Sequence, residues 1–427
     1  MPERWRNWAR DQRCAPERIE RPRGEDELAS LVAGARRLKV AGAGHSFSDI
    51  ACTDGLMIDL SRMNRLPSVE GDQATAEAGI TLRELGPALA AHGLAMENQG
   101  DVDRQTLAGA IATATHGTGG RFGNLSSQVT AVRLVTASGE VVELREGDDL
   151  RAARVGLGAL GAVAAVTLRC VPAFTIHRVD EPRPLDDVLA RLDEHLYMHD
   201  HFELFVFPYT RTALTLTSER TASPAERRFA PAVARPAGPL RAVLVENLAL
   251  ELACRLGSRF PSLIPAINRR LTALMRRSEQ VDRSHRVYAN RRTVRFTEME
   301  YAIPVGRLAE ALERVLELIE RRRLPVGFPI EVRAAAADDA LLSTAYGRPT
   351  GFIAVHLYRG MEFEGYFRAV EAIMDEYDGR PHWGKRHYQS AATLRPRYPE
   401  WDRFLVVRDR LDPERKFEND YLRRVLG

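Results

Sequence analysis

A glycine loop directly after a short apolar strand is the feature that most constrains the fold of this chain. Residues 38–41 are mostly apolar and end at Gly42, and the loop continues through Gly44, His45 and Ser46. Glycines after a strand let the backbone turn sharply and direct successive N–H groups at an anion such as a pyrophosphate. The third glycine of the dinucleotide fingerprint, where a helix would pack, is missing. The loop is therefore not the dinucleotide fingerprint, and a loop of this kind taken alone is more often a plain structural turn.

Two further glycine-rich segments lie in the same part of the chain. Residues 109–120 combine small side chains, hydroxyls and glycines, which allows a large flat ligand to approach the backbone closely. Residues 156–161 form a third such turn before an apolar strand. The presence of three such loops in one part of the chain predicts that together they hold one extended, phosphate-bearing ligand.

Local patterns predict an α+β chain of two domains, because 427 residues exceed what one core usually supports. Thr81 and Glu84 have the spacing of a capping box, so a helix is expected to begin at Thr81 and to end at Gly93. The first domain boundary is placed at Pro172. The other expected elements are strands at 38–41, 56–60, 163–171, 202–207, 328–333 and 352–358, a hairpin at 129–136 and 141–144, and helices at 244–275 (with breaks at Pro261 and Pro265), 306–323 and 362–377.

Composition excludes several classes of protein. A formal charge of +3 is too small for a nucleic-acid-binding protein. The four cysteines, Cys14, Cys52, Cys170 and Cys254, are scattered, which indicates reduced thiols and a cytoplasmic protein. Residues 1–13 lack an apolar signal core, and no apolar stretch is long enough for an integral membrane span. Residues 221–239 are expected to form a mobile surface segment, and residues 244–275 a helical packing surface, with membrane association as the alternative.

Three motifs together resemble a known family. They are residues 42–50 around Gly-His-Ser, residues 115–119 around Thr-His-Gly, and residues 380–388 around His-Trp-Gly-Lys. This ordered set resembles the vanillyl-alcohol-oxidase-type flavoproteins, and within them the aldonolactone oxidases and dehydrogenases that act on gulono-, galactono- or arabinono-1,4-lactones. The resemblance implies an FAD-binding domain over residues 1–172 and an α+β substrate domain over residues 173–427, with residues from about 380 returning to the FAD domain.

The same resemblance implies how FAD is held. In relatives with Gly-His-Ser, the histidine is joined through a ring nitrogen to the 8α-methyl group of FAD, so His45 is the expected attachment point. Gly100 corresponds to a position beside the flavin edge that meets oxygen, where a small residue admits oxygen. Thr106 corresponds to a hydroxyl over the flavin ring, although a core threonine is equally compatible. The full set of expected cofactor-binding residues is Gly42, Ala43, Gly44, His45, Ser46, Gly100, Asp101, Thr106, Gly109, Thr113, Thr115, His116, Gly117, Gly161 and Val163.

Four residues are candidates for the chemistry. Glu331 and Arg333 face the same side of an apolar strand, so they need each other or a polar ligand; a structural ion pair is the alternative. By resemblance, Glu331 binds substrate hydroxyls and Arg333 stabilises reduced flavin. Lys385 is expected near the flavin and the substrate, where it aids alcohol deprotonation. His356 lies in an apolar strand, either as a core histidine or as a residue that favours a lactone over an open polyol.

The expected activity is therefore FAD-dependent oxidation of a sugar-1,4-lactone, with a sugar lactone and oxygen or another electron acceptor as partners and no metal. An alditol oxidase acting on xylitol or sorbitol is the alternative within the same class. A non-catalytic flavin-binding module is the alternative from another class, and the set of Glu331, Arg333 and Lys385 argues against it.

Overall fold

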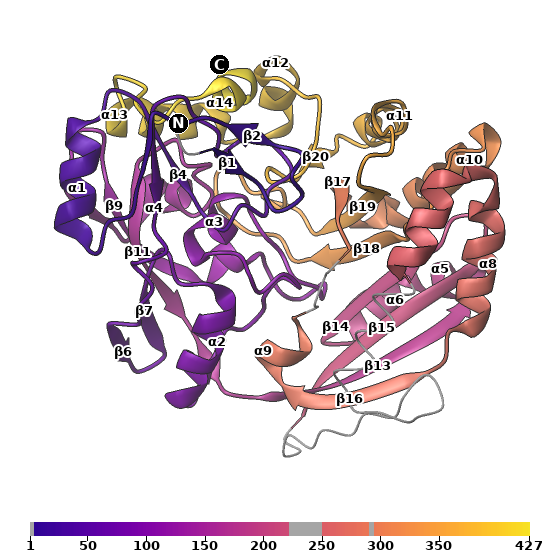
Figure 1. Ribbon diagram of the computed structural model, residues 1–427. Coiled ribbons are helices and arrows are strands. Elements are labelled where there is room, and N and C mark those ends of the chain that lie inside the picture. Colours follow the sequence, from indigo (N-terminus) through magenta and orange to yellow (C-terminus); the bar gives the residue numbers. More distant parts are fainter. Residues whose placement is uncertain (1–3, 222–249, 290–293) are drawn as a thin grey trace.

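The computed structural model describes residues 4–221, 250–289 and 294–427. In the N-terminal part, short strands form two sheets, one parallel and one antiparallel (Figure 1). The parallel sheet has the order β3 (Arg18–Glu20), β5 (Leu56–Asp59) and β4 (Leu38–Ala41). The antiparallel sheet has the order β10 (Val141–Leu144), β9 (Val129–Val135), β11 (Ala162–Arg169), β7 (Gln73–Glu77) and β6 (Ser68–Glu70). Two small ladders join β1 (Trp5–Arg6) to β2 (Arg13–Cys14) and β8 (Leu94–Ala95) to β12 (Val171–Pro172).

An eight-stranded antiparallel sheet dominates the following part of the chain. Its order is β16 (Ser278–Arg283), β13 (Thr175–Pro184), β15 (Thr212–Thr221), β14 (His201–Val206), β18 (Ile330–Ala335), β19 (Thr350–Tyr358), β17 (Phe296–Pro304) and β20 (Arg380–Pro381).

The helices of the N-terminal part are α1 (Glu25–Gly34), α2 (Leu82–Ala91), α3 (Leu107–Ala112) and α4 (Gly147–Ala153). Those that accompany the large sheet are α5 (Leu185–Leu189), α6 (Leu192–Met198), α8 (Ile264–Leu274), α9 (Ser284–Val287), α10 (Leu308–Arg322) and α11 (Glu364–Asp375). The C-terminal helices are α12 (Ala391–Leu394), α13 (Trp401–Leu411) and α14 (Asp420–Leu426). Short 3₁₀ turns occur at Leu125–Gln128, Pro261–Leu263, Val305–Arg307 and Arg395–Arg397.

The two faces of the large sheet differ in chemistry because side chains alternate along each strand. One face is apolar: Met299, Val332 and Val355 pack with Leu312 and Phe367 of α10 and α11 in one buried cluster. The opposite face carries acids and bases. Registered neighbours on that face include Glu298 opposite His356, and Glu331 and Glu300 on either side of Ala354. This polar face supplies one wall of the site.

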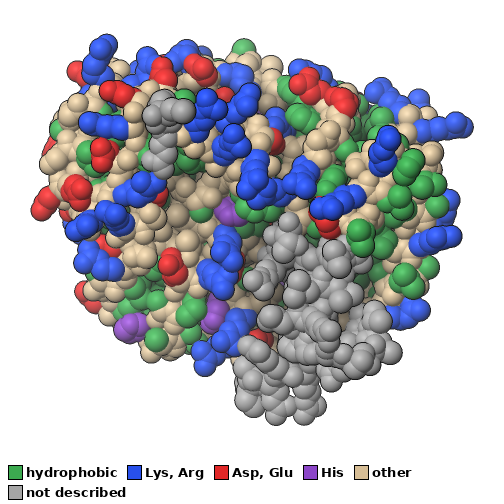
Figure 2. Space-filling model, viewed as in Figure 1, with side chains coloured by type: hydrophobic (Ala, Val, Ile, Leu, Met, Phe, Trp, Pro, Cys, Tyr) green, Lys and Arg blue, Asp and Glu red, His purple; other side chains and the backbone are tan. Residues whose placement is uncertain are grey.

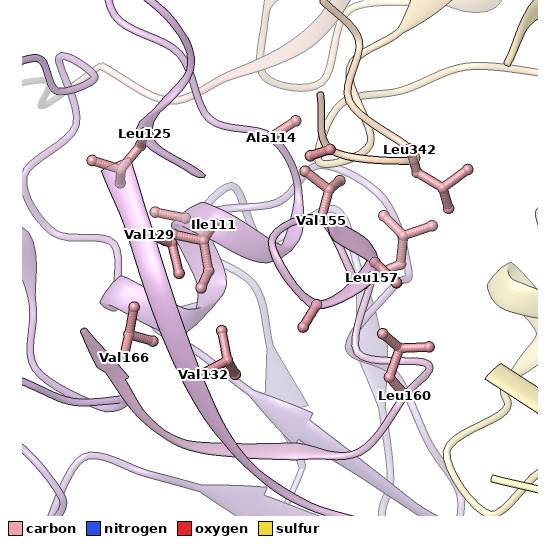
Figure 3. Close-up of a cluster of buried hydrophobic side chains, with 14 of the residues drawn as sticks. Ile111, Ala114, Leu125, Val129, Val132, Val155, Leu157, Leu160, Val166 and Leu342 are labelled. Carbon is pink, nitrogen blue, oxygen red and sulfur yellow. The ribbon is translucent and has the colours of Figure 1, made fainter. Parts of the chain in front are cut away.

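The C-terminal helices pack against the N-terminal part, although they are far from it in sequence. Trp383, Trp401 and Phe404 belong to the same buried cluster as Ile111 and Val132. In Figure 1 the yellow helices α12 to α14 lie over the indigo and purple part. The loop after β18 also reaches this core, since Leu342 points into the cluster formed by Ile111, Val155 and Leu157 (Figure 3).

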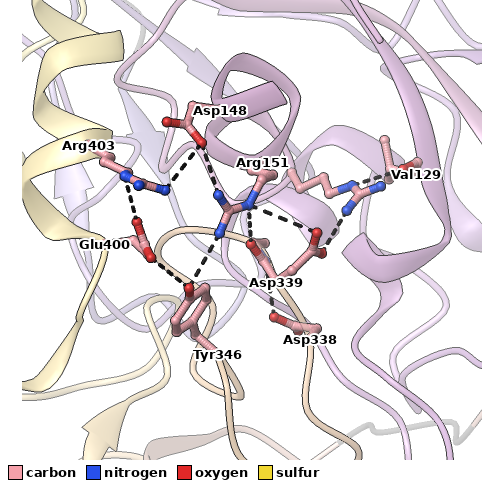
Figure 4. A network of polar contacts seen from close by, with 10 residues as sticks. Val129, Asp148, Arg151, Asp338, Asp339, Tyr346, Glu400 and Arg403 are labelled. Carbon is pink, nitrogen blue, oxygen red and sulfur yellow. Dashed lines mark hydrogen bonds and ion pairs between the residues drawn. The ribbon is translucent and has the colours of Figure 1, made fainter. Parts of the chain in front are cut away.

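A polar network joins the same segments at the edge of this core (Figure 4). Arg151 of α4 pairs with Asp148 at 2.9 Å and donates a hydrogen bond of 3.0 Å to the carbonyl oxygen of Asp339. The hydroxyl of Tyr346 donates to Glu400, the residue directly before α13, at 2.8 Å. These contacts connect α4, the loop after β18 and α13. Partly exposed ion pairs of this kind each contribute about 0–1 kcal/mol to the stability of the folded protein.

Most of the local predictions are confirmed. β4 covers the expected residues, and α2 begins with a complete capping box between Thr81 and Glu84. The predicted break at Pro261 is confirmed, because residues 250–259 are helical and a 3₁₀ turn starts at Pro261. The predicted break at Pro265 is wrong. Pro265 lies in the first turn of α8, where its missing N–H needs no helical partner.

Other boundaries shift by a few residues. The strand expected to begin at residue 328 begins at Ile330, and the one expected over 163–171 is divided into β11 and β12. The expected mobile segment from residue 222 onward and the start of the 244–275 helix lie outside the described residues. No helix in the described parts of the chain is both long and apolar enough to cross a bilayer. On the face shown in Figure 2, Lys and Arg side chains are interspersed with acidic ones.

Candidate cofactor and active site

The three glycine-rich loops meet around one narrow cavity. Its walls are the loop after β4, the α3 segment and the turn at residues 156–161, together with Trp5 and Lys39. The expected cofactor residues that line it are Gly42, Ala43, Gly44, His45, Ser46, Thr106, Gly109, Thr113, Gly161 and Val163. The structure thus brings together segments that are more than a hundred residues apart in sequence.

Glycine is required where these loops touch. A Cβ atom on Gly42 would lie 2.5 Å from Oγ1 of Thr106, so the loop after β4 packs directly on the start of α3. Gly44 has a φ of +72°, a conformation that favours glycine. Oγ1 of Thr106 caps α3 by accepting from the N–H of Gly109 at 3.3 Å. The result is a slot walled largely by main chain, which fits the phosphate-bearing portion of a dinucleotide.

A second and wider cavity of about 790 Å³ continues from the first. The two cavities share His45, Ser46, Gln105 and Thr113, so His45 lies at their junction. The wider cavity is lined by the remaining expected site residues Gly100, Asp101, Thr115, His116, Glu331, Arg333 and Lys385. Its volume is in the range of pockets that hold a small molecule, about 300–1,000 Å³.

Two expected site residues lie elsewhere. Gly117 lines a small adjoining cavity together with Asp101 and Arg333. His356 is not among the residues that line the wider cavity; it lies behind Glu298, with its Nε2 3.4 Å from Oε1 of that carboxylate. His356 therefore reaches the cavity only through Glu298.

Arg333 is surrounded by carboxylates. Its guanidinium contacts Glu331, lies 2.9 Å from Oε2 of Glu203 and lies 3.4 Å from Oδ2 of Asp101. Burial opposes its charge, but Glu331, Glu203 and Asp101 outweigh burial and hold the pKa of Arg333 well above its usual value. Burial raises the pKa of Glu203, and the charges of Arg333 and Arg178 oppose this effect without cancelling it. The expected pairing of Glu331 with Arg333 is present, and it belongs to a larger network.

His116 forms a buried pair with Glu300 on the same wall. Nδ1 of His116 lies 2.9 Å from the carbonyl oxygen of Gly117, which can only accept, so Nδ1 carries a proton. Nε2 lies 2.9 Å from Oε1 of Glu300, and these two atoms share a second proton. Burial disfavours the carboxylate, but His116 outweighs it and holds the pKa of Glu300 below its usual range. Glu300 is therefore ionised.

His116, Glu300 and His382 place potential metal-ligand atoms within 4.8 Å of one another. Nδ1 of His382 accepts a hydrogen bond of 3.0 Å from the N–H of Gly384. Burial lowers the pKa of His382 to about 4, so the ring is neutral and its proton is on Nε2. Neither ring nitrogen is then available to a cation, and we assign no metal to this group.

His45 has the environment of a neutral nucleophile. Burial, followed by the charges of Lys385 and Arg104, lowers the pKa of His45 to about 4. Its ring stacks near Trp8, with the ring centroids 5.7 Å apart. The loop that carries it is held by the N-terminal hairpin, because the N–H of Trp8 donates to the carbonyl of Gly44 at 2.7 Å and the amide of Asn7 donates to that of Ser46 at 3.0 Å.

Several site residues were not expected from the sequence. They are Trp5 and Trp8 of the N-terminal hairpin, Glu203 of β14, and Glu298 and Glu300 of β17. A signal for the last pair was present: Glu298 and Glu300 alternate with Met299 and Tyr301, which is the period of a strand with one polar and one apolar face. The tryptophans belong to no motif and carry no comparable signal.

Lysine is rare in this chain and is concentrated at the cavities. Of the 61 basic residues, only Lys39, Lys385 and Lys416 are lysines. Lys39 lines the narrow cavity, and Lys385 lines the wide one. Lysine differs from arginine in presenting a compact charge and in being able to lose its proton within a protein.

Comparison with known proteins settles the family. The profile of the D-arabinono-1,4-lactone oxidase family matches residues 166–425, and that of an FAD-binding domain matches residues 16–145. This chain belongs to the D-arabinono-1,4-lactone oxidase family. L-gulono-1,4-lactone dehydrogenase of Mycobacterium tuberculosis is 57% identical over 99% of both chains. L-gulonolactone oxidase of Bos taurus is 35% identical over 99% of this chain and 98% of the relative.

The alditol oxidase of a Streptomyces species is less similar to this chain, at 31% identity over 98% of both chains. Cholesterol oxidase from Brevibacterium sterolicum shares the fold, with a TM-score of 0.83 at 16% identity, and the match covers 100% of this chain and 97% of that one. Membership confirms the resemblance inferred from the motifs, the α+β architecture with an FAD-binding domain, and the class of FAD-linked aldonolactone oxidoreductase.

Proposed function

We propose that this protein oxidises a sugar-1,4-lactone at a secondary hydroxyl, with FAD attached to His45, and yields an ascorbate-type product. One observation carries the proposal. A continuous cavity is walled at one end by three glycine loops and at the other by Glu331, Arg333 and Lys385, with His45 at the junction. The lactones named for the relatives, L-gulono-1,4-lactone and D-arabinono-1,4-lactone, are the substrates to test first.

In this proposal the narrow cavity holds the phosphate-bearing part of FAD, and the wide cavity holds its ring and the lactone. FAD, when bound, accepts the hydride from the substrate carbon. Residues 1–172 form the FAD domain and residues 173–427 the substrate domain, with the stretch from about 380 returning to the FAD domain. The packing of Trp383 and Trp401 with Ile111 supports that return.

Each catalytic candidate has a role that follows from its contacts. Glu331 accepts hydrogen bonds from lactone hydroxyls, and Arg333 keeps its charge to offset negative charge that develops during reduction. The carboxylates around Arg333 support this role, because they keep it fixed and charged. Lys385, with its side chain 19% exposed, offers an ammonium to the substrate oxygen.

His45 supplies the covalent link. A neutral imidazole is the nucleophilic form, and a pKa of about 4 leaves nearly all of the ring neutral near pH 7. The position of His45 between the two cavities supports attachment at the flavin ring rather than at the phosphates.

We propose oxygen as an acceptor on the basis of Gly100, which lines the wide cavity. A Cβ atom at this position would lie 2.9 Å from the Thr115 methyl group, so a larger residue here would displace the wall of the cavity. A protein or dye acceptor is the alternative, since relatives carry both oxidase and dehydrogenase names.

The test is anaerobic reduction of the purified protein by a panel of aldonolactones and alditols, followed by reoxidation with air or a dye. We expect bleaching of the flavin by a lactone and slower bleaching by xylitol or sorbitol. Retention of the yellow colour in the pellet after acid precipitation would demonstrate the covalent link. A protein that binds FAD but is bleached by no member of the panel would contradict the proposed activity.

A further inference from the structure

Glu298 connects the wide cavity to a histidine buried behind it. It lies on β17, on the same face as Glu300, and its side chain is 4% exposed. On the cavity side, Oε2 is 2.5 Å from Nζ of Lys385. On the far side, Oε1 is 3.4 Å from Nε2 of His356. Glu298 itself lines the cavity, whereas His356 does not.

The ring of His356 is oriented with its Nε2 toward the carboxylate of Glu298. Its Nδ1 lies 3.2 Å from the carbonyl oxygen of Pro329, which can only accept, so Nδ1 carries a proton. Nε2 then presents its lone pair, and it faces the carboxylate of Glu298 at 3.4 Å. The rings of Phe296 and Phe328 flank the imidazole, with centroids 5.1 and 6.2 Å away.

We propose that Glu298 accepts the proton of the substrate hydroxyl, and that His356 is the positioning residue that takes up this proton from behind. This inference rests on the proposed lactone oxidation. The O–H bond breaks and its proton passes to the Glu298 carboxylate. The C–H bond breaks with its electron pair, which leaves as hydride to the FAD of that proposal, and the carbon–oxygen bond becomes a carbonyl. The ammonium of Lys385 holds the oxygen while this occurs.

The other acids of the cavity are poorer proton acceptors. Glu331 is engaged by the guanidinium of Arg333, and Glu203, on the far side of that guanidinium, does not line the wide cavity. Glu300 is paired with His116 at 2.9 Å, and its pKa is held below the usual range, so it has little affinity for a proton. Glu298 differs from Glu300 because its histidine, His356, stands behind it and does not line the wide cavity, whereas His116 lines that cavity itself. Among the described residues, the charged and titratable groups near Glu298 include Lys385, His356, His382 and, two residues along the strand, Glu300.

The first experiment compares anaerobic reduction of the holoenzyme by the lactone that reduces the wild type. Glu298→Gln keeps the shape of the side chain and removes the base. We expect the reduction rate constant to fall by at least about 100-fold, whereas the dissociation constant for the lactone changes by less than about threefold. In Glu298→Ala, added formate should restore the rate in proportion to its concentration. Glu300→Gln, on the same strand and face, should show no such restoration.

The second experiment does not depend on turnover. Nitrogen chemical shifts of ¹⁵N-histidine-labelled, oxidised protein are measured for the wild type and Glu298→Gln. We expect a protonated Nδ1 at His356 in both, and a changed Nε2 resonance in the variant, whose melting temperature serves as a control for folding. Reduction of Glu298→Gln within about threefold of the wild-type rate would overturn the proposal, as would an unchanged Nε2 resonance. If no lactone reduces the wild type, the proposed function fails, and the resonance still decides whether Glu298 and His356 are coupled.

Discussion

Nζ of Lys39 donates a hydrogen bond of 3.1 Å to the main-chain carbonyl of Phe417, which ties the strand before the His45 loop to the C-terminal segment. A second bond of 3.0 Å reaches the carbonyl oxygen of Gly158 in the third glycine loop. Burial lowers the pKa of Lys39 to about 7, and the charge of Asp412 only partly opposes this effect. One buried amine thus holds together two walls of the narrow cavity and the end of the chain.

This arrangement predicts a pH-dependent stability. The unfolded chain has a lysine of ordinary pKa, so between about pH 7 and pH 10 it binds more protons than the folded chain, and stability rises with pH. Relative to Lys39→Met, the wild type should gain up to about 1.4 kcal/mol per pH unit in this window. Urea unfolding at several pH values measures the difference. Lys416→Met, which alters a partly exposed lysine, is the control, and parallel stability curves for wild type and Lys39→Met would contradict the argument.

Covalent attachment at His45 should tolerate mild acid. Because the pKa of His45 is lowered to about 4, the ring remains neutral and nucleophilic above that pH. Flavin-free protein mixed with FAD should therefore incorporate acid-stable flavin about as fast near pH 5 as near pH 7, and more slowly below about pH 4. Flavin in the pellet after acid precipitation is the measurement. In His45→Ala the flavin should appear in the supernatant, and a freely extractable flavin in the wild type would disprove the link.

Arg333→Ala should destabilise the protein more than Glu331→Gln. Removal of the arginine leaves Glu331, Glu203 and Asp101 facing one another, whereas removal of Glu331 leaves the arginine with two carboxylates. A cost of about 3–5 kcal/mol is expected for Arg333→Ala, and Arg333→Ala/Glu203→Gln should recover part of it. In both single variants FAD should stay bound, and the lactone should reduce it orders of magnitude more slowly than in the wild type. If the folded fraction of these variants is reduced by the lactone at the wild-type rate, the network around Arg333 has only a structural role.

Gly100→Ala should slow reoxidation by oxygen at least about tenfold, or about 1.4 kcal/mol, with little change in reduction by lactone. The added methyl group would meet the Thr115 methyl at 2.9 Å and the carbonyl oxygen of His116 at 3.2 Å, so these neighbours must shift to accommodate it. Gly100→Ala/Thr115→Ser removes the nearer clash and separates oxygen access from folding. Equal melting temperatures with slow reoxidation would support the oxygen path. A wild type that reoxidises slowly in air but rapidly with a dye is a dehydrogenase, and the inference from Gly100 would then be wrong.

The sequence predicted those parts of the site that depend on local chemistry. The loop after β4 and the capping box at Thr81 are specified by neighbours within a few residues, and both are found as expected. The shared side of Glu331 and Arg333 follows from strand alternation alone.

The parts that were missed depend on contacts far apart in sequence. Glu298 and Glu300 become site residues only because β17 pairs with β19, more than fifty residues later in the chain. Leu342 enters the core of the N-terminal part from a loop whose local sequence indicates no such packing. His356 was assigned to the chemistry by the family resemblance, but its placement behind Glu298 depends on the register between β17 and β19, which local patterns do not specify.

The scarcity of lysine gives this protein a small set of amine-labelling targets. Acylating reagents modify lysine and leave arginine unchanged, and two of the three lysines border the cavities. A reagent that enters the wide cavity can reach Nζ of Lys385, whereas the amine of Lys39 is shielded by burial. The extent of acylation at Lys385, read by mass spectrometry against Lys416 as an internal reference, would report occupancy of the wide cavity without any turnover.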